Sequence, residues 1–277
     1  PESTLPQLLV KDTREALGQL GALNRAGYDK PVAAITGSSG KTTVKEMLAC
    51  ILRTRGPVLA TKGNLNNDLG VPLTLLELTH EHTAAVIELG ASRLGEIAYT
   101  VAMTRPHVAV LNNAGTAHVG EFGGPDKIVE AKGEIIEGLD AAGVAVLNLD
   151  DKAFDIWKNR AAGRTVLTFA LSNPKADFHA GDLTRDARGC PGFKLYSPTG
   201  VEQVQLNLLG THNVANALAA AAAAHALGVS LFGIKTGLEA VQPVKGRAVA
   251  QLTAAGLRII DDTYNANPTS MCAAVDI

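Results

Sequence analysis

Short apolar runs alternate with helix-like stretches through much of this chain, and no other feature of the sequence restricts its fold as strongly. The apolar runs occupy residues 32–35, 84–89, 108–111, 144–147 and 165–170. Several segments between them carry apolar residues at helical spacing, as in residues 42–53, where Val44, Met47, Leu48 and Ile51 share one face. Strands that alternate with helices predict an α/β fold with a mainly parallel sheet and helices on both faces.

The pattern changes in the second half of the chain. Residues 177–209 form short alternating pieces with turns at GCPG and SPTG, which predicts a small antiparallel β portion. The alanine-rich stretch THNVANALAAAAAAHALG predicts a tightly packed helix, and RAVAQL and LRIID on either side of TAAG predict a final hairpin. A short amphipathic helix is expected at residues 13–23.

A glycine-rich turn, TGSSGKTT, joins the first apolar run to the helix that follows it. Its members are Gly37, Ser38, Ser39, Gly40, Lys41, Thr42 and Thr43. A helix N-terminus that follows such a turn presents backbone N–H groups and a positive dipole end to one spot, which suits a phosphate. Lys41 supplies an ammonium for terminal phosphates, and Thr42 a hydroxyl able to reach Mg²⁺. Only two residues separate the glycines, so this is a shortened phosphate loop; the Lys-Thr-Thr that follows disfavours an ordinary turn.

Composition limits the classes of partner. The chain has 277 residues, 46% of them hydrophobic, and a net charge of -2. This charge gives no reason to expect nucleic acid or an anionic membrane as a partner. Cys50, Cys190 and Cys272 are few and odd in number, which favours a reducing cytoplasm over a disulfide framework or a zinc site. We expect a cytoplasmic monomer and, because the chain runs from Pro1 to Ile277 without an initial methionine, a fragment of a longer protein.

Polar residues follow two of the predicted strands. Glu88 ends AAVIEL, Asn112 and Asn113 follow VAVL, and His118 lies a few residues beyond. Because the carboxyl ends of parallel strands meet at one edge of a sheet, these side chains are expected near the phosphate loop. A carboxylate in that place suits Mg²⁺. The alternatives are a capping or ion-paired Glu88 and a hydrogen-bonded loop histidine at His118.

A second polar cluster opens the alanine-rich helix at His212, Asn213 and Asn216. An amide side chain offers a donor and an acceptor, which matches the edge of adenine. Helix capping by Thr211 or Asn213 explains the same residues equally well. Arg247 and Asp262 suit a triphosphate and a ribose, although as isolated residues they indicate little.

Six of these motifs occur in the order typical of one enzyme family. TGSSGKTT, IELG, NNAGTAH, EAKGEI, GTHNVANALAA and DDTYNANP resemble the Mur ligases, the ATP-dependent amide-forming enzymes of peptidoglycan precursor synthesis. Within that family, GNLNNDLGVPLTLL at residues 63–76 resembles the members that add D-alanyl-D-alanine to UDP-N-acetylmuramoyl-tripeptide. The resemblance implies three domains: residues 1–30 as the exit of a UDP-sugar-binding domain, 31–260 as the central ATP-binding domain, and 261–277 as the start of a Rossmann-like domain.

The resemblance also implies a role for each matching residue. Lys41 would bind the β- and γ-phosphates, Thr42 and Glu88 a first Mg²⁺, and His118 with a carbamylated Lys132 a second. Asn213 and Asn216 would meet adenine, Arg247 the phosphates, and Asp262 the ribose or a domain hinge. Asn66, Asn67, Asp68 and Asn113 would touch the muramoyl-peptide substrate, although NLNND also suits a hydrogen-bonded turn. The implied reaction passes through an acyl phosphate.

Lys132 is unusual in the pattern itself. Ile128, Ile135, Ile136 and Leu139 form one helical stripe that includes Lys132, whereas Lys127, Glu130 and Glu134 are expected to point elsewhere. A lysine on an apolar face must extend its ammonium to water, find an anion or lose its charge. The pattern alone favours the first outcome.

Two other classes of protein carry a phosphate loop of this kind. A related ligase, such as a folylpolyglutamate or cyanophycin synthetase, shares the ATP motifs but should lack GNLNNDLGVP. A nucleotide-dependent switch or transport ATPase hydrolyses ATP without a carboxylate acceptor. Phosphate release that depends on the acceptor separates these classes from the predicted ligase.

Overall fold

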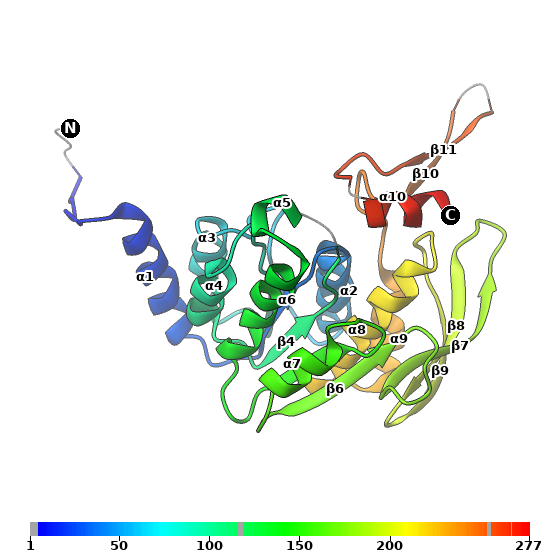
Figure 1. The fold of residues 1–277 in the computed structure, drawn as a ribbon, viewed down its shortest axis with the longest axis horizontal. Helices are drawn as coiled ribbons and strands as arrows, with labels where there is room; N and C mark the ends of the chain where they lie inside the picture. The colour runs from blue at the N-terminus through cyan, green and yellow to red at the C-terminus, as the bar shows by residue number, and fades with distance from the viewer. Residues whose placement is uncertain (1–4, 116–118, 254–255, 267) are drawn as a thin grey trace.

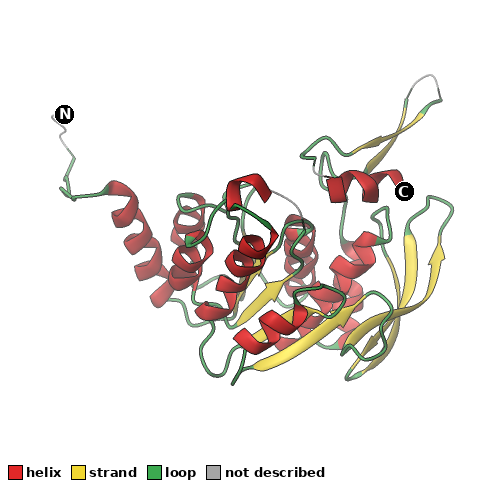
Figure 2. Cartoon of the chain, viewed as in Figure 1, coloured by secondary structure: helices red, strands yellow, loops and turns green. Residues whose placement is uncertain are grey.

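The computed structural model describes residues 5–115, 119–253, 256–266 and 268–277, and confirms the predicted α/β class (Figures 1 and 2). The helices are α1 Thr13–Ala26, α2 Lys41–Arg53, α3 Gly70–Leu76, α4 Glu96–Thr104, α5 Val119–Phe122, α6 Pro125–Gly133, the 3₁₀ helix η1 Glu134–Gly138, α7 Phe154–Arg160, α8 His212–Ala226, α9 Leu231–Ala240 and α10 Pro268–Val275. The strands are β1 Val32–Thr36, β2 Val58–Ala60, β3 Ala84–Glu88, β4 Val108–Leu111, β5 Val144–Asn148, β6 Thr165–Ala170, β7 Phe178–Arg185, β8 Pro191–Ser197, β9 Gly200–Gln205, β10 Val249–Leu252 and β11 Arg258–Asp261.

Nine of the strands form one sheet in the order β2-β3-β1-β4-β5-β6-β7-β8-β9. The pairs from β2 to β7 are parallel, whereas β8 and β9 add to β7 as antiparallel neighbours. The predicted antiparallel portion therefore extends the main sheet instead of forming a sheet of its own. The hairpin β10–β11 is a separate two-stranded sheet at the opposite end of the molecule from α1 (Figure 1).

Alternate residues of the central strands pack into two hydrophobic cores, one on each face of the sheet. Ala33 and Ile35 of β1 join the core that contains α2, α8 and α9. Val32 and Ala34 join the core that contains residues of α3, α4, η1 and α7. All five residues of β1 are buried, which is the burial expected of a parallel strand covered on both faces.

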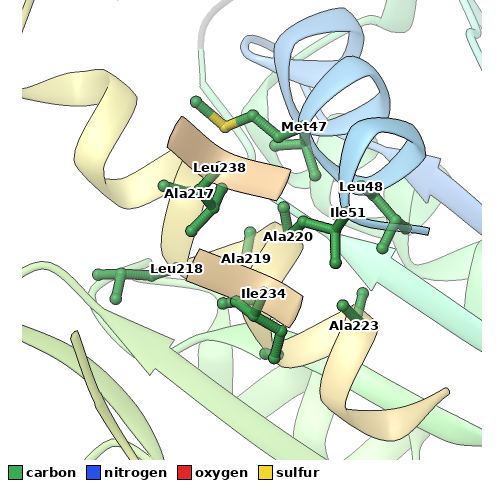
Figure 3. Packing of buried hydrophobic residues seen from close by; sticks show 14 of the residues in the cluster. Met47, Leu48, Ile51, Ala217, Leu218, Ala219, Ala220, Ala223, Ile234 and Leu238 are labelled. Carbon is green, nitrogen blue, oxygen red and sulfur yellow. The ribbon is translucent and has the colours of Figure 1, made fainter. Parts of the chain in front are cut away.

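The alanine-rich helix α8 packs closely because its side chains are small. Eight consecutive residues from Ala217 to Ala224 are fully buried between the sheet and helices α2 and α9. Figure 3 shows Ala217, Ala220 and Ala223 beside Met47 and Ile51 of α2. A Cβ on Gly237 of α9 would lie 2.3 Å from the Cα of Ile51, so α9 also approaches α2 without a side chain between them. The small residues are thus a packing device, as the sequence predicted.

Strand order places the phosphate loop at a topological switch point of the sheet. β1 lies between β3 and β4, so the loops that follow β1, β3 and β4 leave the same edge side by side. Ligands of open α/β sheets bind at such a point. Across the described ranges, no helix has both the length and the apolarity needed to cross a bilayer.

Candidate active site

The residues that follow β4 form hydrogen bonds with the phosphate loop. The backbone N–H of Ser38 donates to the carbonyl of Asn113 at 3.0 Å, and the N–H of Ser39 donates to Asn113 Oδ1 at 2.9 Å. In return, Asn112 Nδ2 and Asn113 Nδ2 both donate to the carbonyl of Ser39. The first turn of α2 then carries the backbone N–H groups that no intrahelical carbonyl accepts, and these can receive an anion.

A side chain at Gly40 would force its neighbours to move. Its φ of +76° lies in the left-handed region, and an added Cβ would lie 2.4 Å from Asn216 Oδ1 and 2.5 Å from Asn112 Nδ2. Asn112 Nδ2 donates to Asn216 Oδ1, and Asn216 Nδ2 donates to Asn213 Oδ1. A buried chain of amides therefore connects α8 to the loop.

The hydrogen bonds at the start of α8 exclude one of the two explanations of its asparagines. Thr211 is the residue before α8 but its side chain makes no capping bond, and Asn213 Nδ2 donates to the carbonyl of Leu209 at 2.7 Å. Helix capping is thus wrong for both. Asn213 and Asn216 line a cavity beside the loop, so their predicted contact with adenine stays a prediction.

Thr42 and Glu88 meet at the carboxyl end of β3. Thr42 Oγ1 donates to Glu88 Oε2 at 2.9 Å, and Glu88 is only 2% exposed. The backbone N–H of Glu88 donates to Thr61 Oγ1 at 2.9 Å, which fixes the end of the strand. Glu88 is therefore neither a helix cap nor a surface ion pair. Its second oxygen, Oε1, accepts a hydrogen bond from Asn66 Nδ2 at 2.8 Å.

The donor set at this point fits Mg²⁺. No group of three His, Cys, Asp or Glu arranged for a metal occurs among the described residues. Mg²⁺ does not need one, because it keeps several waters and binds one or two protein oxygens together with substrate phosphates. The Thr42 hydroxyl and the Glu88 carboxylate are two oxygens in contact beside the phosphate loop. His118, the residue predicted for a second ion, lies outside the described residues.

Lys41 lies at the junction of the phosphate loop and α2. It is the first residue of α2, it is partly buried, and its Nζ donates to the carbonyl of Gly37 at 2.8 Å. Burial lowers the pKa of Lys41, and Arg247 lowers it further while Glu88 opposes the shift. The ammonium is therefore bonded back to the loop, and Lys41 lines the same cavity as the loop.

Lys132 is buried, so the expectation that its ammonium reaches water is wrong. It is 3% exposed on α6, with Nζ 5.4 Å from the centre of the Phe122 ring. No described residue forms a hydrogen bond or ion pair with that Nζ. Burial lowers the pKa of Lys132 to about 7, helped by Lys41 and opposed by Glu134 and Glu96.

Glu134 also departs from its prediction. The continuous helical stripe is interrupted, because α6 ends at Gly133 and a 3₁₀ helix follows. Glu134 turns inward, is 6% exposed and accepts the backbone N–H groups of Gly95 and Ala98 at 2.7 and 2.9 Å. It therefore caps α4, which the sequence pattern had no means of indicating.

The NLNND segment is a structured turn in front of α3. Asn67 Oδ1 accepts the backbone N–H of Gly70 at 2.8 Å, Asp68 forms an ion pair with Arg14, and Asn66 holds Glu88. Asn66, Asn67 and Asp68 also line the cavity above Glu88. The turn was one of the two alternatives, and the predicted substrate contacts of these residues and of Asn113 stay predictions.

The C-terminal segment reaches back to the phosphate loop through Arg247. Its Nη2 donates to Thr42 Oγ1 at 2.9 Å, and its guanidinium lies 4.1 Å from the centre of the Tyr264 ring. Asp262 Oδ1 accepts the backbone N–H of Ala248 at 3.1 Å. Sequence reasoning missed Tyr264, although it lies inside the DDTYNANP motif and its ring supports the predicted phosphate-binding arginine.

Two cavities meet at the loop. One of ≈ 450 Å³ is lined by the loop, Glu88, Lys132 and the NLNND turn, and the other of ≈ 230 Å³ by the start of α8, Asn148, Leu208 and Val241. Both include Ser39, Gly40, Arg247 and Asp262. A charged and a partly apolar compartment joined at a phosphate loop suit the phosphates and the base of one nucleotide.

The comparisons with known proteins agree with this geometry. The Mur ligase middle domain matches residues 35–224. The chain belongs to the Mur ligase family. An Escherichia coli relative, UDP-N-acetylmuramoyl-tripeptide--D-alanyl-D-alanine ligase, is 48% identical over 99% of this chain and 60% of its own length. This Mur ligase chain thus spans well under two thirds of that relative.

Solved structures give the same family. MurF from Acinetobacter baumannii is 48% identical, with a TM-score of 0.95 over 100% of this chain and 60% of that one. MurF from Thermotoga maritima in complex with ADP is 30% identical, with a TM-score of 0.86 over 99% of this chain and 64% of that one. The Mur ligase core described above is therefore shared by a protein solved with a nucleotide.

Proposed function

We propose that the protein to which this chain belongs adds D-alanyl-D-alanine to UDP-N-acetylmuramoyl-tripeptide at the expense of ATP. The observation that carries the proposal is the contact of Thr42 with the buried Glu88 beside a phosphate loop. The chain that makes this contact is 48% identical to the Escherichia coli UDP-N-acetylmuramoyl-tripeptide--D-alanyl-D-alanine ligase. The same relatives favour this activity over a folylpolyglutamate-type ligase or an ATPase switch. The matched relatives are longer than this chain, so the activity is assigned to the whole protein.

The chemistry needs a leaving group, because a carboxylate is a poor electrophile. An oxygen of the tripeptide carboxylate attacks the γ-phosphorus and ADP leaves, which gives an acyl phosphate. The amine of D-alanyl-D-alanine then attacks the acyl carbon, loses a proton, and expels phosphate with the bonding electron pair. Positioning and charge neutralisation supply most of the catalysis in such transfers.

Each part of the loop has a task in this sequence. Lys41 and the first turn of α2 would bind the terminal phosphates, and Arg247 adds a guanidinium that is hydrogen-bonded to Thr42. Thr42 and Glu88 would hold a Mg²⁺, which neutralises phosphate charge when bound. The smaller cavity, with Asn213 and Asn216, would receive the base, and Asp262 the ribose.

The buried Lys132 suits conversion to a carbamate. Carbon dioxide adds only to a neutral amine, and burial brings the pKa of Lys132 to about 7, so neutral amine is present at neutral pH. Loss of one proton leaves an anionic oxygen ligand that, together with His118, would hold a second Mg²⁺. The resemblance to Mur ligases is the source of this assignment, and burial supports it.

We further propose that residues 31–260 form the ATP-binding domain of a cytoplasmic enzyme. The free thiols of Cys50, Cys190 and Cys272 are consistent with a reducing compartment.

The decisive experiment measures phosphate release by the full-length protein with ATP and UDP-N-acetylmuramoyl-tripeptide, with and without D-alanyl-D-alanine. The proposal expects release that depends on both acceptors and a product heavier by one dipeptide residue in mass spectrometry. Release without any acceptor would assign the protein to the ATPase class. Release with folate or another amino-acid acceptor alone would assign it to a related ligase.

A further inference from the structure

Asn66 makes a contact that its expected role does not require. The resemblance to Mur ligases places it against the muramoyl-peptide substrate, but its Nδ2 donates to Glu88 Oε1 at 2.8 Å. The other carboxylate oxygen, Oε2, receives the Thr42 hydroxyl at 2.9 Å. Asn66 and Thr42 therefore hold the two oxygens of one buried carboxylate from different segments of the chain.

Asn66 is itself fixed from several directions. Its backbone carbonyl accepts the N–H of Gly90 at 2.8 Å, and its own N–H donates to the carbonyl of Asn64 at 2.7 Å. The side-chain amide lies close to Gly90, where an added Cβ would come within 2.7 Å of Asn66 Oδ1 and 2.9 Å of Cγ. Because Gly90 lies two residues after Glu88, the turn before α3 is tied to the end of β3 at the backbone and at the side chain.

The hydrogen bond from Asn66 matters because Lys41 also attracts the Glu88 carboxylate. Lys41 lies close enough for the carboxylate to affect its ammonium electrostatically. Both residues line the same cavity. A carboxylate turned toward the ammonium of Lys41 would engage the phosphate-binding lysine and draw Oε2 away from Thr42. A donor on Oε1 keeps Oε2 directed at Thr42, where the two oxygens can act on the same cation.

We propose that Asn66 is a positioning residue that orients the Glu88 carboxylate for a divalent cation, and that this is its main role in place of contact with the muramoyl peptide. The inference rests on the proposed function only in taking Thr42 and Glu88 as the oxygen ligands of Mg²⁺. Side-chain partners that orient a metal ligand commonly contribute 10–100-fold to metal affinity, so about that loss is expected here.

The test measures the affinity of the full-length protein for ADP in a calorimeter at increasing Mg²⁺ concentrations, without any muramoyl peptide. Asn66→Ala should raise the Mg²⁺ concentration that gives half-maximal tightening of ADP binding by roughly 10-fold or more. Glu88→Gln sets the upper limit of the effect. Gly90→Ala keeps the amide but forces it away from its position, so it should reproduce part of the same shift.

Asn67→Ala is the matched control in the same turn. Its side chain accepts the backbone N–H of Gly70 at the start of α3, and no hydrogen bond joins it to Glu88 among the described residues. The Mg²⁺ midpoint should therefore stay within about twofold of that of the unaltered protein, whatever happens to substrate binding. A shift of the same size in Asn67→Ala would mean that Asn66→Ala only loosens the turn, and would overturn the inference.

Three further outcomes would distinguish a failure of this inference from a failure of the proposed function. In the full-length protein, an Asn66→Ala variant with an unchanged Mg²⁺ midpoint and a raised KM for the muramoyl peptide would restore the substrate role and overturn ours. If ADP binding by the unaltered chain shows no dependence on Mg²⁺, both this inference and the metal site of the proposed function fail. If the midpoint shifts as expected but D-alanyl-D-alanine is not an acceptor, only the proposed function fails.

Discussion

Positive side chains crowd around the carboxylate of Glu88. Lys41, Lys132 and Arg247 line the same cavity, and the proximity of Lys41 helps to lower the pKa of Lys132. Like charges held together in a partly buried site destabilise one another, and the phosphates of a nucleotide would relieve that repulsion. The residues of the cavity are therefore arranged for a polyanion more than for the stability of the chain alone.

Lys41→Ala tests the phosphate role directly. Nζ makes one described hydrogen bond, to the carbonyl of Gly37, so the fold should survive its loss. Acceptor-dependent phosphate release by the full-length enzyme should fall on the order of 10²–10³-fold, the usual loss for one group that stabilises developing charge. Lys127→Ala, which removes a lysine paired with Glu130 on the exposed side of α6, is the control and should retain the rate. Normal turnover in Lys41→Ala would exclude the phosphate role.

Lys132 predicts a dependence on pH and on carbon dioxide. Its pKa is lowered to about 7, so the amine is largely neutral above that pH and becomes protonated as the pH falls through it. Ligase activity should therefore drop below about pH 7, and bicarbonate should raise it most at and above that pH. Lys132→Ala should lose most activity and recover part of it with short carboxylic acids. Full activity in Lys132→Ala, or equal rates in bicarbonate-free buffer, would contradict the carbamate.

The sequence could indicate which residues gather at the site, but not how they bond to one another. Strand ends and motif order brought Lys41, Thr42, Glu88 and Asn113 to one sheet edge, and the structure places them there. Whether Asn66 faces a substrate or Glu88 depends on the backbone of two separate segments. Such a long-range choice leaves no trace in periodicity. The capping role of Glu134 was hidden for the same reason.

At the scale of elements, apolar periodicity located most of the sheet. The runs at β1, β3 and β4 were found because strands buried on both faces are continuously apolar. The runs at β5 and β6 were found by the same apolar signal, although the ends of β5 and the first four residues of β6 are less buried. β2 has only three residues, two of them half-buried, so its signal is too short to separate from a loop. The attachment of β7 to β6 as a parallel neighbour also could not be read, because turn motifs report only local hairpins.

Gly40 connects the loop to α8, and its replacement tests this connection. Gly40→Ala places a Cβ against Asn216 and Asn112 at a φ of +76°, so the loop must move and affinity for ADP should fall at least 10-fold. Gly163→Ala is the matched control, because Gly163 has a φ of +84° with nothing within 4 Å of an added Cβ. Both variants should lose roughly 1–2 kcal/mol of stability through the left-handed backbone. Equal ADP binding in the two variants, by calorimetry, would show that the amide chain does not support the loop.

At the scale of the whole molecule, the nucleotide site and the catalytic reaction make different demands on the chain. The phosphate loop, Glu88, the start of α8 and Arg247 all come from the described part of this chain and surround both cavities. The relatives it matches are longer, and this chain spans 60% of the Escherichia coli protein. We therefore expect the residues present here to bind a nucleotide, whereas the proposed ligation also needs both substrates to be positioned at the reacting atoms.

The 277-residue chain alone should accordingly bind ADP or ATP in the presence of Mg²⁺ and form no amide bond. Binding should be weaker than in the full-length protein, because the segment that carries Arg247 and Tyr264 contacts the loop through few groups, chiefly the hydrogen bond of Arg247 to Thr42. Calorimetry with ADP measures the first expectation, and mass spectrometry after incubation with ATP, UDP-N-acetylmuramoyl-tripeptide and D-alanyl-D-alanine measures the second. The full-length protein in the same assay is the positive control. Dipeptide addition by the isolated chain would mean that residues 31–260 already hold both acceptors, and the proposed division of labour between domains would then be wrong.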